Sequence, residues 1–100
     1  MKAVWNGKVV AEAGKEDLIY IERNWYFPPS SVQQDLLRKS NTPYNCPWKG
    51  NCQFFDVGAS DNWSADSAFC YPAPKKSAID TVKKDFAHYV CFWRDVTVEE

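Results

Sequence analysis

The segment Cys46-Pro47-Trp48-Lys49-Gly50 holds the two side chains of this sequence that are best suited to chemistry, a thiol and a primary amine. Pro47 restricts the preceding residue to extended backbone, which would hold the Cys46 thiol in one direction. A nearby lysine lowers the pKa of a thiol when a turn brings the two together. Cys46 and Lys49 are therefore the candidate catalytic residues, with Cys46 as nucleophile or redox group. The alternative is a buried, inert Cys46, with Trp48 packed at the edge of the core and Lys49 solvated.

The remaining cysteines lack the spacing of a metal site. Structural zinc sites usually present two ligands separated by about two to four residues. Here five residues separate Cys46 from Cys52, while Cys70 and Cys91 stand alone in apolar segments. We therefore expect free thiols, no metal and no other cofactor, and we interpret Cys52, Cys70 and Cys91 as small core residues. The only histidine, His88, is interpreted as a surface or packing residue and not as a general base.

Aromatic side chains make up 16% of the chain, enough to build both a core and a binding surface. Seven of them stand near the ends of expected strands or in turns: Trp25, Tyr26, Phe27, Tyr44, Trp48, Trp63 and Tyr71. Rings in loops beside a lysine could line a pocket with a few polar groups. The alternative is a rim that closes one end of a small β core. The candidate ligand-binding residues are Asn24, Tyr26, Trp48 and Tyr71.

The elements that must position these residues are mostly short strands. Asn6-Gly7 between two strand-like segments is typical of a two-residue hairpin turn. Arg23-Asn24 could close a second tight turn, because asparagine tolerates left-handed backbone. Further strands are expected at residues 18–22, 25–27, 51–57, 67–71, 88–93 and 96–99. The class predicted is mainly β.

Two short helices and two connecting segments complete the prediction. Ser30 or Ser31 could cap a helix that ends near Arg38-Lys39. A second helix is expected after Ser77, where Ala78, Ile79, Val82 and Phe86 recur at helical spacing. Residues 47–50 are predicted as a turn, and residues 58–65 as a polar loop that carries Trp63.

Length and charge limit the number of domains and the kinds of partner that the protein can bind. One hundred residues predict a single domain spanning residues 1–100. The net charge is −1 and the lysines form only short pairs, which argues against a nucleic-acid surface or a polybasic membrane patch. Apolar runs of signal-peptide or membrane-spanning length are absent, so we expect a cytoplasmic protein. The four glycines do not have phosphate-loop spacing, and there is no G-x-S-x-G motif.

Five segments in this order resemble the domain-of-unknown-function 427 family, over nearly the whole chain. They are AVWNG at 3–7, NWYFPPSSV at 24–32, CPWKG at 46–50, AFCYPAP at 68–74 and YVCFWRDVTVE at 89–99. The resemblance implies a small, mostly bacterial protein with a compact β-tent fold similar to that of methionine sulfoxide reductase B. It also brings the label nucleotidyltransferase-like, which the absence of a phosphate loop and of paired metal-binding carboxylates does not favour.

The family motif, carried over to this chain, singles out one thiol. It falls on Asn24, Tyr26, Phe27, Pro28, Cys46, Pro47, Lys49, Gly50, Tyr71 and Pro72. Cys52, Cys70 and Cys91 lie outside it. Tent-fold relatives hold zinc with paired C-x-x-C knuckles, which this sequence lacks, so the resemblance also argues against a metal.

Our leading hypothesis is a cytoplasmic domain that binds a small molecule at the turn around Lys49, and that is an enzyme if Cys46 acts as nucleophile or redox group. Tyr26, Trp48 and Tyr71 would stack on or enclose the ligand. Lys49 would pair with an anionic group or polarise a carbonyl.

Two other hypotheses compete with it. In a thiol redox protein, Cys52 or Cys70 would resolve a sulfenic acid formed at Cys46. In a non-catalytic interaction module, exposed rings such as Trp63 would form a partner surface on one convex face.

Overall fold

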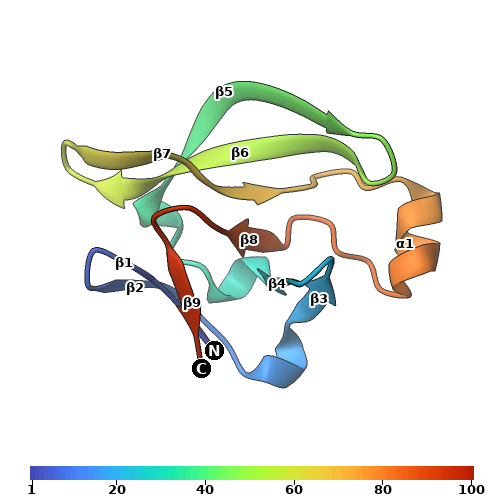
Figure 1. Cartoon of the computed structure of the whole chain (residues 1–100), viewed down its shortest axis with the longest axis horizontal. Helices are drawn as coiled ribbons and strands as arrows, with labels where there is room; N and C mark the ends of the chain where they lie inside the picture. Colours follow the sequence, from blue (N-terminus) through green and yellow to red (C-terminus); the bar gives the residue numbers. More distant parts are fainter.

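The structure is a computed structural model that describes residues 1–100 as two antiparallel sheets and one α-helix (Figure 1). The smaller sheet has the strand order β2-β1-β9, from β1 (Lys2–Trp5), β2 (Lys8–Glu12) and β9 (Thr97–Glu99). The larger sheet has the order β3-β4-β8-β7-β6-β5. Its strands are β3 (Ile19–Ile21), β4 (Asn24–Phe27), β5 (Leu37–Cys46), β6 (Gly50–Ala59), β7 (Asn62–Cys70) and β8 (Val90–Phe92). The mainly-β prediction is confirmed.

The helix α1 (Lys76–Val82) lies at the end of the larger sheet where β5 turns into β6 (Figure 1). It is shorter than predicted, because Lys83 takes a left-handed conformation that ends it, and Phe86 lies beyond the helix, fully buried. No helix has the length and apolar character that crossing a membrane would require.

Two tight turns join the first four strands. Asn6 and Gly7, with φ of 49° and 77°, connect β1 to β2 as predicted. The turn between β3 and β4 lies one residue earlier than predicted, at Glu22 and Arg23, with φ of 52° and 69°. Asn24 is the first residue of β4 and not a turn residue. The hairpin therefore places a glutamate in left-handed backbone, where asparagine or glycine is usual.

The helix expected over residues 30–39 is absent. Two 3-10 turns, Pro29–Ser31 and Gln34–Leu36, replace it, and β5 begins at Leu37. Leu37 pairs with Val57 of β6, so the long antiparallel ladder outweighs the local helical pattern. The loop predicted over residues 58–65 is wrong for the same reason, since β6 and β7 pair up to a turn at Ser60-Asp61.

The larger sheet separates two cores, and strand alternation decides which side chain faces which core. The inter-sheet core lies between the two sheets and contains Ala3, Trp5, Val10, Ala11, Leu18, Phe27, Val32, Val57, Ala68, Cys70, Val90, Phe92 and Val96. The helix-side core lies on the opposite face, toward α1, and contains Ile19, Ile21, Tyr26, Cys46, Tyr71, Ala78, Phe86 and Cys91.

One row of side chains crosses four neighbouring strands on the helix-side face. Tyr26 of β4 is opposite Cys91 of β8, Cys91 is opposite Phe69 of β7, and Phe69 is opposite Phe54 of β6. Because Cys91 is small, the rings of Tyr26 and Phe69 meet edge to face across it, with centroids 6.1 Å apart. This row supports the floor of the site described below.

Candidate functional site

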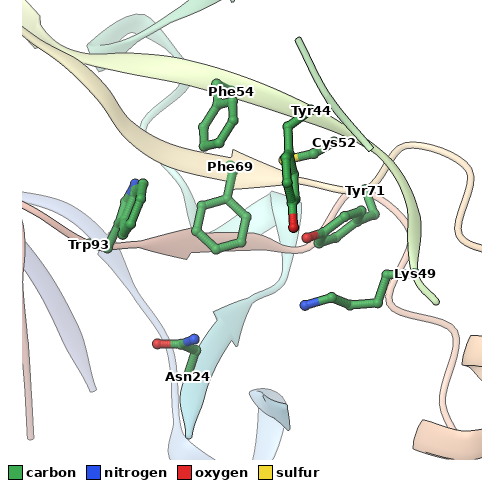
Figure 2. Close-up of a pocket in the computed structure, with 8 residues that line it drawn as sticks. All are labelled: Asn24, Tyr44, Lys49, Cys52, Phe54, Phe69, Tyr71 and Trp93. Atoms are coloured by element: carbon green, nitrogen blue, oxygen red, sulfur yellow. The ribbon is translucent and has the colours of Figure 1, made fainter. Parts of the chain in front are cut away.

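A pocket of about 370 Å³ opens on the helix-side face of the larger sheet, a size typical of small-molecule sites. Its lining residues are Asn24, Tyr44, Lys49, Cys52, Phe54, Phe69, Tyr71 and Trp93 (Figure 2). Six of the eight are hydrophobic, and the lining contains one cation and no carboxylate. In Figure 2 the Lys49 side chain extends into the space between Asn24 and the aromatic rings.

Strand register places the rings of the pocket. Tyr44 of β5 is opposite Cys52 of β6, and Phe54 of β6 is opposite Phe69 of β7. Residues two apart on a strand face the same side, so Cys52 and Phe54 line the pocket together. The intervening residues face away from it, and Cys70, for example, packs in the inter-sheet core.

Trp93 follows β8 and closes the side of the pocket away from Lys49 (Figure 2). Its ring stacks on Phe54 at 20° with centroids 6.4 Å apart, and meets Phe69 edge to face at 5.9 Å. Its indole N–H donates to the backbone oxygen of Asp66 at 2.6 Å, which fixes the orientation of the ring. The ring is 40% exposed, so it is an ordered aromatic wall that a ligand can reach.

Lys49 is the only charged residue that the fold buries. Its ammonium donates to the carboxylate of Glu22 at 2.5 Å and lies 3.5 Å from the hydroxyl of Tyr26. It also lies 4.9 Å from the ring centre of Tyr71 and 5.3 Å from that of Trp48, within the range of cation–π attraction. A buried cation thus stands among aromatic faces, with a single carboxylate as its counterion.

The turn that carries Lys49 is tied to the segment before α1. Gly50 has φ of +115°, which favours glycine strongly over other residues. The backbone N–H of Lys75 donates to the Lys49 oxygen at 2.9 Å, and the Lys75 ammonium donates to the Pro47 oxygen at 2.7 Å. These bonds hold the Lys49 backbone in place, so the direction of its side chain is set by the fold.

Glu22 is a site residue that sequence reasoning missed. Its only hydrogen-bond partner is Lys49, 27 positions away in the sequence. Non-glycine residues with positive φ cost free energy and often occur at functional sites, and Glu22 and Arg23 both have it. The usable signal was a two-residue hairpin turn made of charged residues in place of asparagine and glycine.

The four ligand-binding residues expected from the sequence lie around Lys49 at different depths. Asn24 and Tyr71 line the pocket. Tyr26 is fully buried beneath it and reaches it only through its hydroxyl beside Lys49. Trp48 is partly buried against the helix-side core and contacts the amine from outside the lining. Most of the walls come from Tyr44, Phe54, Phe69 and Trp93. Tyr44 was named from the sequence among the rings that could line a pocket, and the other three were not named.

The two predicted catalytic residues have different surroundings in the structure. Lys49 lines the pocket, whereas Cys46 is buried in the helix-side core and is not part of the lining. The thiol that lines the pocket is Cys52, which the sequence analysis assigned to the core. Cys70 packs on the opposite face of the sheet from Cys46. The catalytic roles of Cys46 and Lys49 stay predictions.

All four thiols are free. Burial raises the pKa of three of them, which favours the neutral form. Burial raises the pKa of Cys52 to about 12, that of Cys91 to about 12 and that of Cys70 to about 11. Burial also raises the pKa of Tyr26 and of Tyr71 well above the ordinary tyrosine value. Of these groups, Cys52 and Tyr71 line the site, as a neutral thiol and a neutral phenol, which leaves Lys49 and Glu22 as its charges.

No three histidine, cysteine, aspartate or glutamate side chains are grouped so that they could hold a metal ion. His88 is exposed and lies outside the pocket lining. Trp63 does not belong to the pocket either, because its ring packs under the guanidinium of Arg38, 4.3 Å from the ring centre.

Comparison with protein-family models defines the class to which this fold and site belong. The model of the family described as "Domain of unknown function (DUF427)", labelled NTP_transf_9, matches residues 1–100. The chain therefore belongs to the DUF427 family, as the five ordered segments predicted. Among curated proteins, none matches the chain.

Proposed function

We propose that this protein binds a small molecule with a flat, ring-containing body and one polar group that faces Lys49. The observation that carries the proposal is an open, mainly aromatic pocket with a buried ammonium at one end. Pockets of this kind bind the body of a ligand by apolar contact and orient it through a few polar groups. Trp93 and Tyr44 would contact the rings of the ligand, and Lys49 and Asn24 its polar group.

The energetics favour binding over a purely structural role for Lys49. Burying an ammonium costs free energy that a single ion pair offsets only partly. Replacing such a pair by apolar residues is often neutral or stabilising, so stability alone does not explain why a lysine occupies this position. A group that recognises a ligand explains both the lysine and the aromatic walls beside it.

The two competing hypotheses fit the geometry less well. A redox mechanism through Cys46 would need a resolving thiol, but Cys70 lies on the other face of the sheet, and burial raises the pKa of Cys52. An interaction module would present scattered rings on a convex face. Here Tyr44, Phe54, Phe69 and Trp93 converge on a hollow instead (Figure 2).

Binding can be tested with two fluorescent probes that share one skeleton. 1-Anilinonaphthalene-8-sulfonate carries an anion, and N-phenyl-1-naphthylamine is its neutral counterpart. We expect both to bind the folded protein at one site. Trp93→Ala should lower the affinity for both probes about five- to tenfold, since one aromatic contact contributes about 1 kcal/mol. Lys49→Gln should weaken the anionic probe by about tenfold or more and the neutral probe little, because an ionic hydrogen bond contributes about 1.5–3 kcal/mol.

Two matched variants control for unspecific effects. Tyr20→Ala removes an exposed ring outside the pocket, and Lys76→Gln removes an exposed lysine on α1. Neither should change the affinity of either probe. Equal weakening by Trp93→Ala and Tyr20→Ala, or failure of both probes to bind, would contradict the proposal.

A further inference from the structure

The ion pair between Lys49 and Glu22 is unequal in exposure. The Lys49 side chain is 7% exposed, whereas the Glu22 side chain is 54% exposed. Removing the anion from a buried cation leaves an uncompensated charge, which is strongly unfavourable. Releasing the Glu22 carboxylate into water costs little desolvation energy, because that side chain is already more than half exposed. Lys49 thus needs an anion beside it, while Glu22 does not need Lys49.

Glu22 is also the partner that is free to move. The Glu22 side chain forms a hydrogen bond only with Lys49, and Glu22 lies in a two-residue hairpin turn. Lys49 is held on several sides, by Tyr26, by the Trp48 and Tyr71 rings and by the backbone bond from Lys75. If the pair opens, the carboxylate leaves and the ammonium stays.

The pocket provides space beside Lys49 for an anion that replaces the Glu22 carboxylate. Lys49 faces it, and its lining contributes no carboxylate that would repel a negative charge. Asn24 also lines the pocket, below the aromatic rings in Figure 2, and brings an amide that can donate a second hydrogen bond. The remaining lining is aromatic or a neutral thiol. An acidic group would therefore find its favourable position beside Lys49.

We propose that Glu22 is an exchangeable counterion, which the acidic group of a flat aromatic or heteroaromatic ligand displaces from Lys49. The ligand class is then a small ring compound bearing one carboxylate or similar anion, and Glu22 moves into solvent as the ligand binds. This inference rests on the proposed function and specifies its ligand. Since Glu22 competes for the same ammonium, it also sets how tightly the site binds an anion.

Glu22→Gln tests the exchange directly, with the same two probes. Glutamine keeps the length of the side chain and removes the competing charge. We expect the affinity for 1-anilinonaphthalene-8-sulfonate to rise about tenfold and that for N-phenyl-1-naphthylamine to change less than twofold. The control Glu16→Gln removes an exposed carboxylate that makes no ion pair, and should leave both affinities unchanged. Glu22→Asp keeps the charge on a shorter side chain and should give an intermediate increase.

The outcomes separate this inference from the proposed function. If both probes bind, respond to Trp93→Ala and show no gain with Glu22→Gln or Glu22→Asp, the exchange is wrong and the binding site stands. An equal gain for both probes would also overturn the exchange, because the neutral probe does not compete with a carboxylate. If neither probe binds the unaltered protein, the proposed function fails and the inference fails with it. Circular dichroism of each variant shows that the fold is retained, and Glu22→Asp decides the matter if Glu22→Gln does not fold.

Discussion

At the scale of single residues, Lys49 and Cys52 show what a sequence pattern can and cannot predict. The turn around Lys49 was identified from its own residue types, because it combines a thiol, a proline and a primary amine within five residues. The pattern also placed Cys52 and Phe54 correctly on one side of a strand. It could not tell that this side is a pocket, because that depends on how far β5, β7 and Trp93 cover it.

The sequence pattern also could not predict contacts between distant residues, because these depend on how the strands are arranged. Glu22 and Lys49 belong to separate hairpins, and only the antiparallel arrangement of the larger sheet brings them together. Likewise, Cys46 was favoured as the reactive thiol because of the proline after it, the nearby Lys49 and the family motif. None of these three grounds contains information on burial.

The raised pKa of Cys52 predicts slow alkylation in the native protein. At pH 7.5–9 a thiol with a pKa of about 12 is almost entirely protonated, and the thiolate is the reactive form. We expect iodoacetamide to modify Cys52 at least about a hundredfold more slowly than in the urea-unfolded chain, where the pKa is near 8.5. Mass spectrometry of the tryptic peptides measures both rates. Equal rates in the two states would contradict the burial of this thiol.

At the scale of elements, local signals worked where the turn residues themselves specify a hairpin and failed where the long ladder of β5, β6 and β7 decides. The Asn6-Gly7 hairpin was predictable because the turn residues themselves specify it. Residues 30–39 contain helical spacing and capping signals, yet β5 begins within them at Leu37, because the ten-residue strand β6 pairs with it at seven positions. The helical signal was too short to outweigh that pairing.

The turn between β3 and β4 predicts a stabilising substitution. Arg23 has φ of 69° and makes no hydrogen bond or ion pair through its side chain, so glycine would relieve unfavourable backbone at little loss. We expect Arg23→Gly to raise the free energy of unfolding by about 0.5–1 kcal/mol, measured by urea denaturation. Lys76→Gly, at the start of α1, is the comparison and should lower it by a similar amount. Destabilisation by Arg23→Gly would show that the side chain makes a contribution that its contacts do not reveal.

At the scale of the whole molecule, four buried acidic groups and the partly buried Cys52 predict a marked sensitivity to alkali. The pKa values of Cys52, Cys70, Cys91, Tyr26 and Tyr71 are all raised in the folded state. The stability associated with them is complete below the pKa values of the unfolded chain, and it is lost as pH rises through the window up to the folded values.

We therefore expect the free energy of unfolding to fall steeply above about pH 9. The decrease is about 1.4 kcal/mol per pH unit for each proton that only the unfolded chain releases. Urea denaturation at pH 7, 8, 9 and 10 measures the slope. Cys91→Ala should reduce the slope by the contribution of about one proton, about 1.4 kcal/mol per pH unit, because it removes one buried thiol. A free energy that stays constant up to pH 10 would contradict the raised pKa values.

The alternation along β6 and β7 has a consequence for engineering new binding specificity. Positions 54 and 69 face the pocket, while positions 57, 68 and 70 pack in the inter-sheet core. Randomising the first set in a combinatorial library would thus vary the chemistry of the site and leave the packing between the two sheets unchanged. Trp93 and Tyr44 extend that set at positions that are partly exposed. The larger sheet thus separates the residues that can be varied to change the ligand from most of the residues that pack the two sheets together.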